Sequence, residues 1–128
     1  MNRIDTLDQV FSKYIRLRDS NGKSFRCISC GHVYNFDEGD CGHFVKRSNM
    51  ATRFDEENCY AQCVYCNRFM DGNYERFREN LENKIGKEKV DELIRRGHTT
   101  KKYSKSEIED LIKYYRERIK EFEKRVSA

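Results

Sequence analysis

Apolar positions repeat at helical spacing near both ends of this chain and lose that spacing in the middle. After Asp5 and Thr6, apolar side chains recur every three to four residues, which predicts an amphipathic helix over residues 5–18. These positions are Leu7, Val10, Phe11, Tyr14, Ile15 and Leu17. The polar, glycine-containing stretch 19–22 predicts the end of this helix.

The middle of the chain has no helical period. Residues 25–66 are rich in Gly, Asn, Asp and Cys, which favours knuckles, short strands and loops without a long helix. Helical spacing returns over residues 66–85, with a break expected at Gly72, and it continues after Gly86. The repeating positions are Phe69, Tyr74, Phe77, Leu81, Ile85, Val90, Leu93 and Ile94. This pattern predicts a helix, a turn and a second helix.

A last amphipathic helix is predicted at the C-terminal end. Ser104 and Glu107 have the spacing of a capping box, and one apolar stripe follows them. The stripe consists of Ile108, Leu111, Ile112, Tyr115, Ile119 and Phe122. We therefore expect a helix of about twenty residues here. The predicted organisation is one domain over residues 1–98, including the N-terminal helix, followed by an amphipathic helical appendage over 99–128.

Composition indicates a small apolar core. Of the 128 residues, 38% are charged and 37% hydrophobic, and the mean hydropathy is −1.00. The net charge of +4 is mildly basic and does not by itself indicate a nucleic-acid partner. The sequence contains neither a long apolar run nor the apolar region of a signal peptide, so membrane insertion and secretion are not expected. We expect a cytoplasmic, reducing environment.

Four of the six cysteines have the spacing of a metal site. Cys27 and Cys30 form one C-x-x-C pair, and Cys63 and Cys66 form another. Two such knuckles direct four thiolates at one ion, the arrangement of tetrahedral structural zinc. In a chain with little apolar mass, the metal replaces part of a core. The remaining two, Cys41 and Cys59, are interpreted as free thiols that fill small gaps.

Three polar residues lie between and beside these knuckles in an informative order. His43, Asn58 and Asn67 stand 15 and then 9 positions apart, which resembles the H-N-N form of the HNH nuclease family. The resemblance implies a hairpin that presents the histidine and middle asparagine, followed by a helix that presents the last asparagine. The expected fold class is α+β: a small zinc-stabilised ββα-metal core flanked by helices, with a mostly helical C-terminal half.

A larger set of stretches resembles the NinG family of phage recombination proteins, also called Rap. They are 11–16 (FSKYIR), 27–31 (CISCG), 42–44 (GHF), 50–58 (MATRFDEEN), 61–63 (AQC), 66–69 (CNRF) and 72–73 (GN). The resemblance implies a phage-encoded, metal-dependent endonuclease that cuts branched DNA such as Holliday junctions and D-loops. Where HNH nucleases often have an acidic or histidine ligand before the general base, this chain has Gly42, and the nearest acid is Asp40.

A phosphodiester substrate assigns roles to these residues. His43 is the expected general base, because an unperturbed imidazole is largely neutral near pH 7, and the backbone or side chain of Asn58 is expected to orient it. Asn67 and Asp40 offer hard oxygen ligands suited to Mg²⁺, with Mn²⁺ as an alternative. Asp71 lies four residues after Asn67, so on a continuous helix it is either a further ligand or an exposed acid.

DNA contact is expected from basic residues around the predicted hairpin. Side chains of this type bind phosphates without reading bases. The candidates are Lys46, Arg47, Arg53 and Arg68. Because junction cleavage needs two symmetric cuts, a homodimer is a further expectation. Two alternatives stay open: an HNH nickase of ordinary DNA, and a non-catalytic zinc-stabilised binding module in which His43 is structural.

Overall fold

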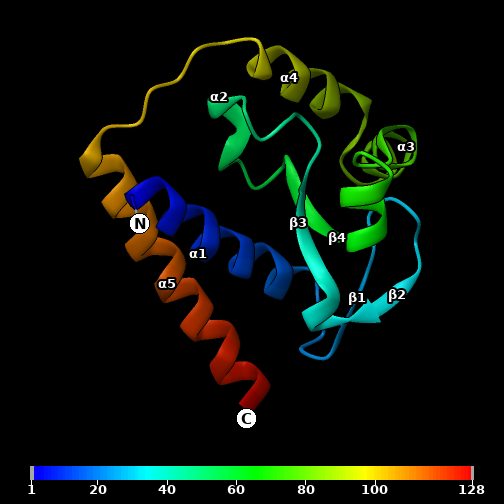
Figure 1. The fold of residues 1–128 in the computed structure, drawn as a ribbon, viewed down its shortest axis with the longest axis horizontal. Coiled ribbons are helices and arrows are strands. Elements are labelled where there is room, and N and C mark those ends of the chain that lie inside the picture. Colours follow the sequence, from blue (N-terminus) through cyan, green and yellow to red (C-terminus); the bar gives the residue numbers. More distant parts are fainter. Residues whose placement is uncertain (1, 128) are drawn as a thin grey trace.

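The computed structural model describes residues 2–127, with side chains through residue 125, and it confirms an α+β protein (Figure 1). In chain order the elements are α1 (Arg3–Arg18), β1 (Ser24–Arg26), β2 (Val33–Asn35), the 3₁₀ turn η1 (Phe36–Glu38), β3 (Gly39–His43), α2 (Met50–Arg53), β4 (Cys59–Cys63), the π-helical turn η2 (Tyr65–Phe69), α3 (Tyr74–Ile85), α4 (Lys87–Gly97) and α5 (Lys105–Ser127). Among the described helices, none is both long and apolar enough to cross a membrane.

Two small antiparallel sheets occupy the middle of the chain. β1 pairs with β2, with Phe25 opposite Tyr34. β3 pairs with β4, with His43 opposite Cys59. A long connection, residues 44–58, joins β3 to β4 and contains the short helix α2. The central region therefore consists of short strands, turns and loops, as the sequence pattern predicts.

The helix boundaries follow local capping. α1 begins at Arg3, two residues before the predicted start, because the Asn2 side chain accepts a hydrogen bond of 2.9 Å from the Asp5 backbone N–H. At the other end of the chain the predicted capping box is confirmed. The Ser104 Oγ accepts from the Glu107 N–H at 3.1 Å, and the Glu107 carboxylate accepts from the Ser104 N–H at 3.1 Å.

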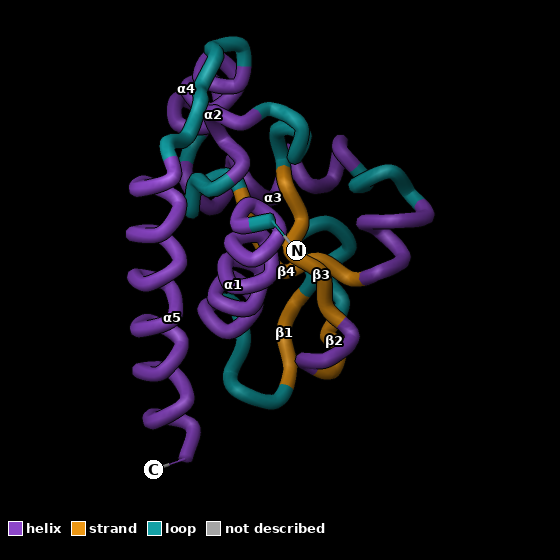
Figure 2. Tube along the Cα trace, turned by 60° about the vertical axis from the view of Figure 1, so that its left-hand side comes forward, coloured by secondary structure: helices purple, strands orange, loops and turns teal. Residues whose placement is uncertain are grey.

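The first apolar core lies between α1 and α5, which run side by side in both views (Figures 1 and 2). Phe11 packs against Tyr115 at a centroid distance of 5.1 Å, and Tyr14 packs against the same ring at 4.9 Å. Ile112 and Ile119 continue the buried stripe of α5. The C-terminal helix is thus packed against the N-terminal helix along the predicted apolar stripe.

The second core is formed by the predicted helix–turn–helix. α3 and α4 are separated by Gly86, whose φ of 93° ends α3 in a conformation that favours glycine. Their buried side chains pack against aromatic residues at the end of β3 and in β4. The buried members are Phe44, Tyr60, Phe77, Leu81, Val90 and Leu93. This core holds the two helices against the β3–β4 pair.

Glu56 connects the first core to the long β3–β4 connection. Its carboxylate accepts hydrogen bonds from the hydroxyl groups of Tyr14, at 2.8 Å, and Tyr115, at 3.1 Å. Burial and the bond to Glu56 raise the pKa of Tyr14 to about 12. Since the folded-state pKa lies above the ordinary value, this tyrosine contributes stability that is complete below pH 10 and is lost as the pH rises toward 12.

Replacing Glu56 with Gln should lower the free energy of unfolding by about 1–3 kcal/mol, because an amide offers only one acceptor oxygen to two tyrosine donors. Urea unfolding followed by circular dichroism measures this change. Glu109→Gln is the matched control, since it breaks the exposed pair with Arg3 and should leave the free energy of unfolding nearly unchanged. Equal losses for the two variants would contradict the assigned role of Glu56.

Candidate functional site

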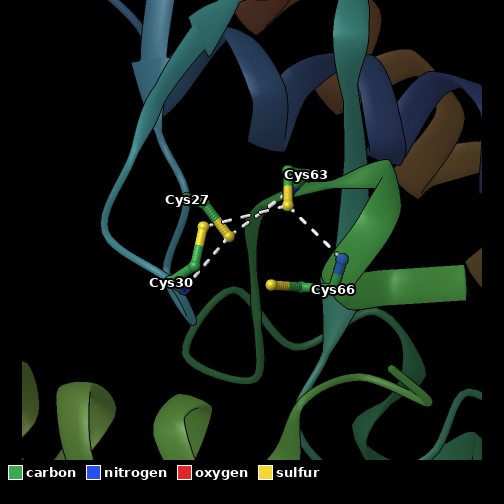
Figure 3. Close-up of side chains that lie close together, drawn as sticks. All are labelled: Cys27, Cys30, Cys63 and Cys66. Carbon is green, nitrogen blue, oxygen red and sulfur yellow. Dashed lines mark hydrogen bonds between the residues drawn. The ribbon is translucent and has the colours of Figure 1, made fainter. Parts of the chain in front are cut away.

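Four cysteine sulfurs meet at one point between the two sheets. Cys27 and Cys30 lie in the turn between β1 and β2, Cys63 ends β4, and Cys66 lies in η2. All four sulfurs lie within 4.8 Å of one another, and Figure 3 shows them gathered from these two segments. The predicted grouping is confirmed, and this cluster could bind a metal such as zinc in tetrahedral coordination.

Backbone and side-chain donors surround these sulfurs. The Cys63 N–H donates to Cys27 Sγ at 3.3 Å, and the Cys66 N–H donates to Cys63 Sγ at 3.3 Å. The Asn73 amide donates to Cys66 Sγ at 3.4 Å. Donors directed at sulfur favour the thiolate form, whereas burial raises the pKa of the Cys66 thiol to about 12. A bound cation supplies the missing positive charge, so the donor set fits a metal.

His43 lies beside an open cavity of about 500 Å³ between the β3–β4 pair and the start of α3. Lys46, Arg47, Asn67 and Asp71 line the same cavity. A neighbouring cavity of about 300 Å³ also includes His43 and Asn67 in its lining, together with Asp40 and Arg68. The structure therefore brings together most of the residues that the sequence singles out.

A cavity of about 540 Å³ lies elsewhere, between α1 and α5. Its polar lining includes Arg3, which is paired with Glu109, and Lys13, which is paired with Glu123. The lining contains neither histidine nor cysteine. The site chemistry is therefore concentrated at the β3–β4 pair.

The imidazole of His43 is held by a backbone carbonyl. His43 Nε2 lies 3.0 Å from the carbonyl oxygen of Arg53. Because a carbonyl only accepts hydrogen bonds, Nε2 carries the proton and, in the neutral ring, the lone pair is on Nδ1. Burial lowers the pKa of His43, and the nearby Arg47 charge acts in the same direction. The ring is therefore neutral near pH 7 and able to accept a proton.

The side chain of Asn58 bonds the backbone of the β3–β4 connection and not the imidazole of His43. Its Oδ1 accepts from the Val45 N–H at 2.8 Å, and its Nδ2 donates to the carbonyls of Val45 and Thr52, both at 3.1 Å. Asn58 is buried, and these bonds hold the two ends of the connection between β3 and β4 together. The imidazole donates to the Arg53 carbonyl in place of the expected contact with Asn58, whose own bonds hold the loop that carries this carbonyl.

Asp40 and Asn67, the two residues predicted to hold Mg²⁺, are hydrogen-bonded neighbours. The Asn67 Nδ2 donates to Asp40 Oδ2 at 2.9 Å. Arg68 also donates to both oxygens of this carboxylate, at 2.9 Å each. The Asp40 side chain is only 15% exposed, whereas Arg68 is 64% exposed. Hard oxygen atoms are thus present here, paired with an arginine whose side chain is exposed to solvent.

The helical argument for Asp71 is wrong, although its location is informative. η2 ends at Phe69, and Asp71 adopts a positive φ of 48° in the turn before α3. Residues 67 and 71 therefore do not share the face of a continuous helix. Asp71 is exposed, and it still lines the cavity of His43 and Asn67.

The predicted DNA contacts divide into two groups. Lys46, Arg47 and Arg68 are exposed. Arg53 is only 13% exposed and forms an ion pair with Asp8 of α1. We therefore assign Arg53 to positioning, because its guanidinium fixes α2 on α1 and its carbonyl holds His43.

Gly42 has no room for a side chain. A Cβ at this position would lie 2.2 Å from Oε1 of Gln62, the residue of β4 packed beside it. Gln62 is fully buried and donates from Nε2 to the Ser29 hydroxyl at 2.8 Å and to the Gly72 carbonyl at 2.7 Å. Position 42 therefore cannot supply a metal ligand, which leaves Asp40 as the acid that β3 contributes near His43.

Two features of the site were not predicted from the sequence. Asp8, on the polar face of α1, bonds both Arg53 and Arg47 and lines the smaller cavity. Cys41 and Cys59, interpreted as gap-filling thiols, lie with His43 so that the two sulfurs and a ring nitrogen are within 4.8 Å of one another. The signal in the sequence for this second group was the two-residue spacing of Cys41 and His43, which places both side chains on the same face of a strand.

Comparison with known proteins identifies a family. Residues 2–125 match the family model described as "Bacteriophage Lambda NinG protein". The chain is 35% identical to "Protein ninG" of Escherichia phage 933W over 121 residues, covering 92% of this chain and 57% of that protein. It is 33% identical to "Protein ninG" of Escherichia phage lambda, covering 92% of this chain and 56% of that protein. The chain thus spans little more than half the length of these relatives. No solved structure matches it.

Replacing Cys66 with Ser should remove the bound metal and loosen the central region, because η2 and the β1–β2 turn lose the tie between them. Metal analysis should find one tightly held zinc per chain in the parent protein prepared without added metal, and circular dichroism should find a lower melting temperature in the variant. His32→Ala is the control, since this exposed histidine near Cys30 should leave both properties unchanged. A Cys66 variant that keeps its metal and its melting temperature would disprove the assignment.

Proposed function

Because this chain belongs to the bacteriophage NinG family, we propose that it is a metal-dependent HNH-type endonuclease that cleaves branched DNA recombination intermediates in the host cytoplasm. One observation carries the proposal: His43 and Asn67 line two neighbouring cavities at the β3–β4 pair, and Asp40 lines the smaller of them. The order β3, β4, η2 agrees with a ββα-metal motif in which η2 presents the last asparagine.

His43 is the general base in this mechanism. The Arg53 carbonyl fixes the ring through Nε2, which leaves the Nδ1 lone pair to take the proton from an attacking water. The lowered pKa keeps this lone pair available near neutral pH. Asn58 supports the base indirectly, since its hydrogen bonds hold the connection that carries Arg53.

Asp40 and Asn67 fit a hard divalent cation. The carboxylate oxygens and amide oxygen are the donor types that Mg²⁺ prefers, and Asp40 is largely shielded from solvent. Mn²⁺ accepts the same donors. When bound, the cation stabilises the negative charge that develops on the scissile phosphate. Asp71 lies on the same cavity and is the available acid for a further contact, direct or through water.

Arg68 and the basic pair Lys46 and Arg47 bind the DNA backbone. Arg68 is held by Asp40 and exposed, so an incoming phosphate competes for its guanidinium and frees the carboxylate for the cation. Lys46 and Arg47 line the larger of these cavities together with His43. Contacts of this kind position a phosphate without reading sequence.

Exposed aromatic side chains favour a branched substrate over a fully paired one. Tyr65 and Phe69 stack on each other at 6.2 Å and are 62% and 76% exposed. Both lie on η2 with Asn67 and Arg68. Unpaired bases at a branch point stack on such surfaces, whereas the bases of a continuous duplex are already stacked. Symmetric cleavage of a junction needs a second site, which a homodimer supplies.

A non-catalytic DNA-binding module is the second candidate. The ion pair between Asp40 and Arg68 favours it, because the guanidinium already neutralises this carboxylate. The two candidates differ in one measurable property, since only the nuclease needs His43 for an event after DNA binding. An HNH nickase would cut linear duplex and four-way junctions at similar rates.

Replacing His43 with Ala should reduce cleavage of a labelled four-way junction by about 10²- to 10⁴-fold, because the general base is lost. Single-turnover cleavage with Mg²⁺ measures the rate. Zinc content, helix content and junction affinity should not change, since His43 is not part of the four-cysteine cluster. The parent enzyme should lose activity only as the pH falls below about 6.5, because the pKa of His43 is lowered. An unchanged cleavage rate in the variant would favour the binding module.

Replacing Lys46 and Arg47 together with Ala should weaken junction binding and make it less dependent on salt, with a smaller effect on the rate at saturating protein. Binding titrations at several salt concentrations measure both quantities. Lys101→Ala is a control, since this residue pairs with Glu107 at the start of α5, away from the cavity lining. The interface is placed wrongly if the control lowers affinity as much as the double variant.

A further inference from the structure

A second group of metal-binding side chains includes the residue that we assign as the base. The sulfurs of Cys41 and Cys59 and one ring nitrogen of His43 all lie within 4.8 Å of one another. This group is separate from the four-cysteine cluster and shares no residue with it. Neither the spacing of the knuckles nor the H-N-N pattern requires these two cysteines.

The sheet register brings the three side chains to one face. Cys41 and His43 are two residues apart on β3, so their side chains leave the same side of the strand. Cys59 lies directly opposite His43 on β4. Cross-strand and same-face neighbours of this kind are close enough for their side chains to meet. The β3–β4 pairing therefore presents two sulfurs and a nitrogen as a preformed group.

The donor types select a particular class of ion. Thiolate and imidazole favour zinc and similar thiophilic ions, whereas Mg²⁺ prefers oxygen. In tetrahedral coordination two thiolate sulfurs lie about 3.8 Å apart, which follows from Zn–S bonds of about 2.3 Å. The two sulfurs and the ring nitrogen, all within 4.8 Å of one another, lie close to this spacing. Three protein ligands leave a fourth coordination position open.

The surroundings allow an ion to enter from one side. Cys59 is fully buried, but Cys41 and His43 both line the two cavities beside β3. On the side of α1 the smaller cavity carries Asp8 and Ser12. An ion bound here would therefore be reached from the same space that the scissile phosphate occupies in the proposed nuclease.

We propose that Cys41, His43 and Cys59 form a second, thiophilic metal site whose occupancy removes His43 from catalysis. Binding displaces the two thiol protons to solvent and involves no change of oxidation state. A neutral imidazole has a single basic lone pair, so whichever ring nitrogen binds the ion, the ring can no longer take a proton from water, and Zn²⁺ at this site and cleavage exclude each other. The inhibition rests on the proposed function, whereas the binding site itself does not.

Cobalt titration of the zinc-containing protein tests the site without DNA. Starting from one zinc per chain, we expect the parent protein to bind one further Co²⁺ with a thiolate-to-cobalt absorption band in the near ultraviolet. Cys59→Ala and Cys41→Ser should each lose this band and the second ion. Ser12→Ala is the matched control, since it removes a polar group of the smaller cavity outside the cluster and should bind as the parent does. Two cysteine variants guard against a folding defect in one of them, and circular dichroism verifies both.

Junction cleavage at saturating Mg²⁺ provides the second readout. Added Zn²⁺ should abolish parent activity in proportion to the second sites filled, and Cys59→Ala should keep its activity at the same Zn²⁺ concentration. Absence of a second ion, or its retention in both cysteine variants, would overturn the proposal. If the second ion binds as expected but junctions are never cut, the metal site stands and the nuclease function fails.

Discussion

The four-cysteine cluster is the constraint on which the central part of this molecule depends. It joins the turn between β1 and β2 to the end of β4 and the start of η2, segments that are more than thirty residues apart in sequence. In the described part of the chain the buried apolar residues form three separate clusters, and the smallest of them contains three of these cysteines. A tie of this kind replaces missing apolar burial in small, highly charged domains. Because Cys66 precedes Asn67, the same tie also sets where the candidate metal ligand lies.

The β3–β4 connection performs a second, independent positioning task. Asn58 binds both sides of this connection, and the ion pair between Asp8 and Arg53 attaches it to α1. As a result the Arg53 carbonyl is fixed against His43. The residues that hold the imidazole are thus different from those that hold the cysteine cluster. Loss of metal at the cluster would disturb the cavity through η2. Loss of order in the connection would disturb it through the imidazole.

Local signals explain which parts were predictable. Helical periodicity predicted α1, α3, α4 and α5, and the spacing of Cys27, Cys30, Cys63 and Cys66 predicted their meeting, because each signal lies in a short stretch of sequence. The resemblance to the NinG family was also correct. The H-N-N pattern and the preference of Mg²⁺ for oxygen ligands singled out His43, Asn67 and Asp40, and these residues line the neighbouring cavities beside β3, although their roles stay predictions.

The remaining features depend on tertiary contacts that no local pattern reports. The bond from Arg53 to His43 uses a backbone carbonyl, which any residue type could supply. The burial of Arg53 follows from its pairing with Asp8, 45 positions earlier in the chain. The helical argument for Asp71 failed because η2 is a single π-helical turn that ends before it. Side-chain types alone could not distinguish these arrangements from solvated ones.

Gly42 and Gln62 are sterically interlocked across the β3–β4 pair. The Gln62 amide occupies the space that a side chain at position 42 would fill. This amide donates hydrogen bonds to the Ser29 hydroxyl, near one C-x-x-C pair, and to the Gly72 carbonyl, beyond the other. A larger residue at position 42 is compatible with this fold only if position 62 becomes smaller, and the bridge between the two knuckles is then lost. The residue beside the histidine is therefore determined by the packing around the cysteine cluster. A substitution at this position of the site requires a compensating change in the packing that supports the site.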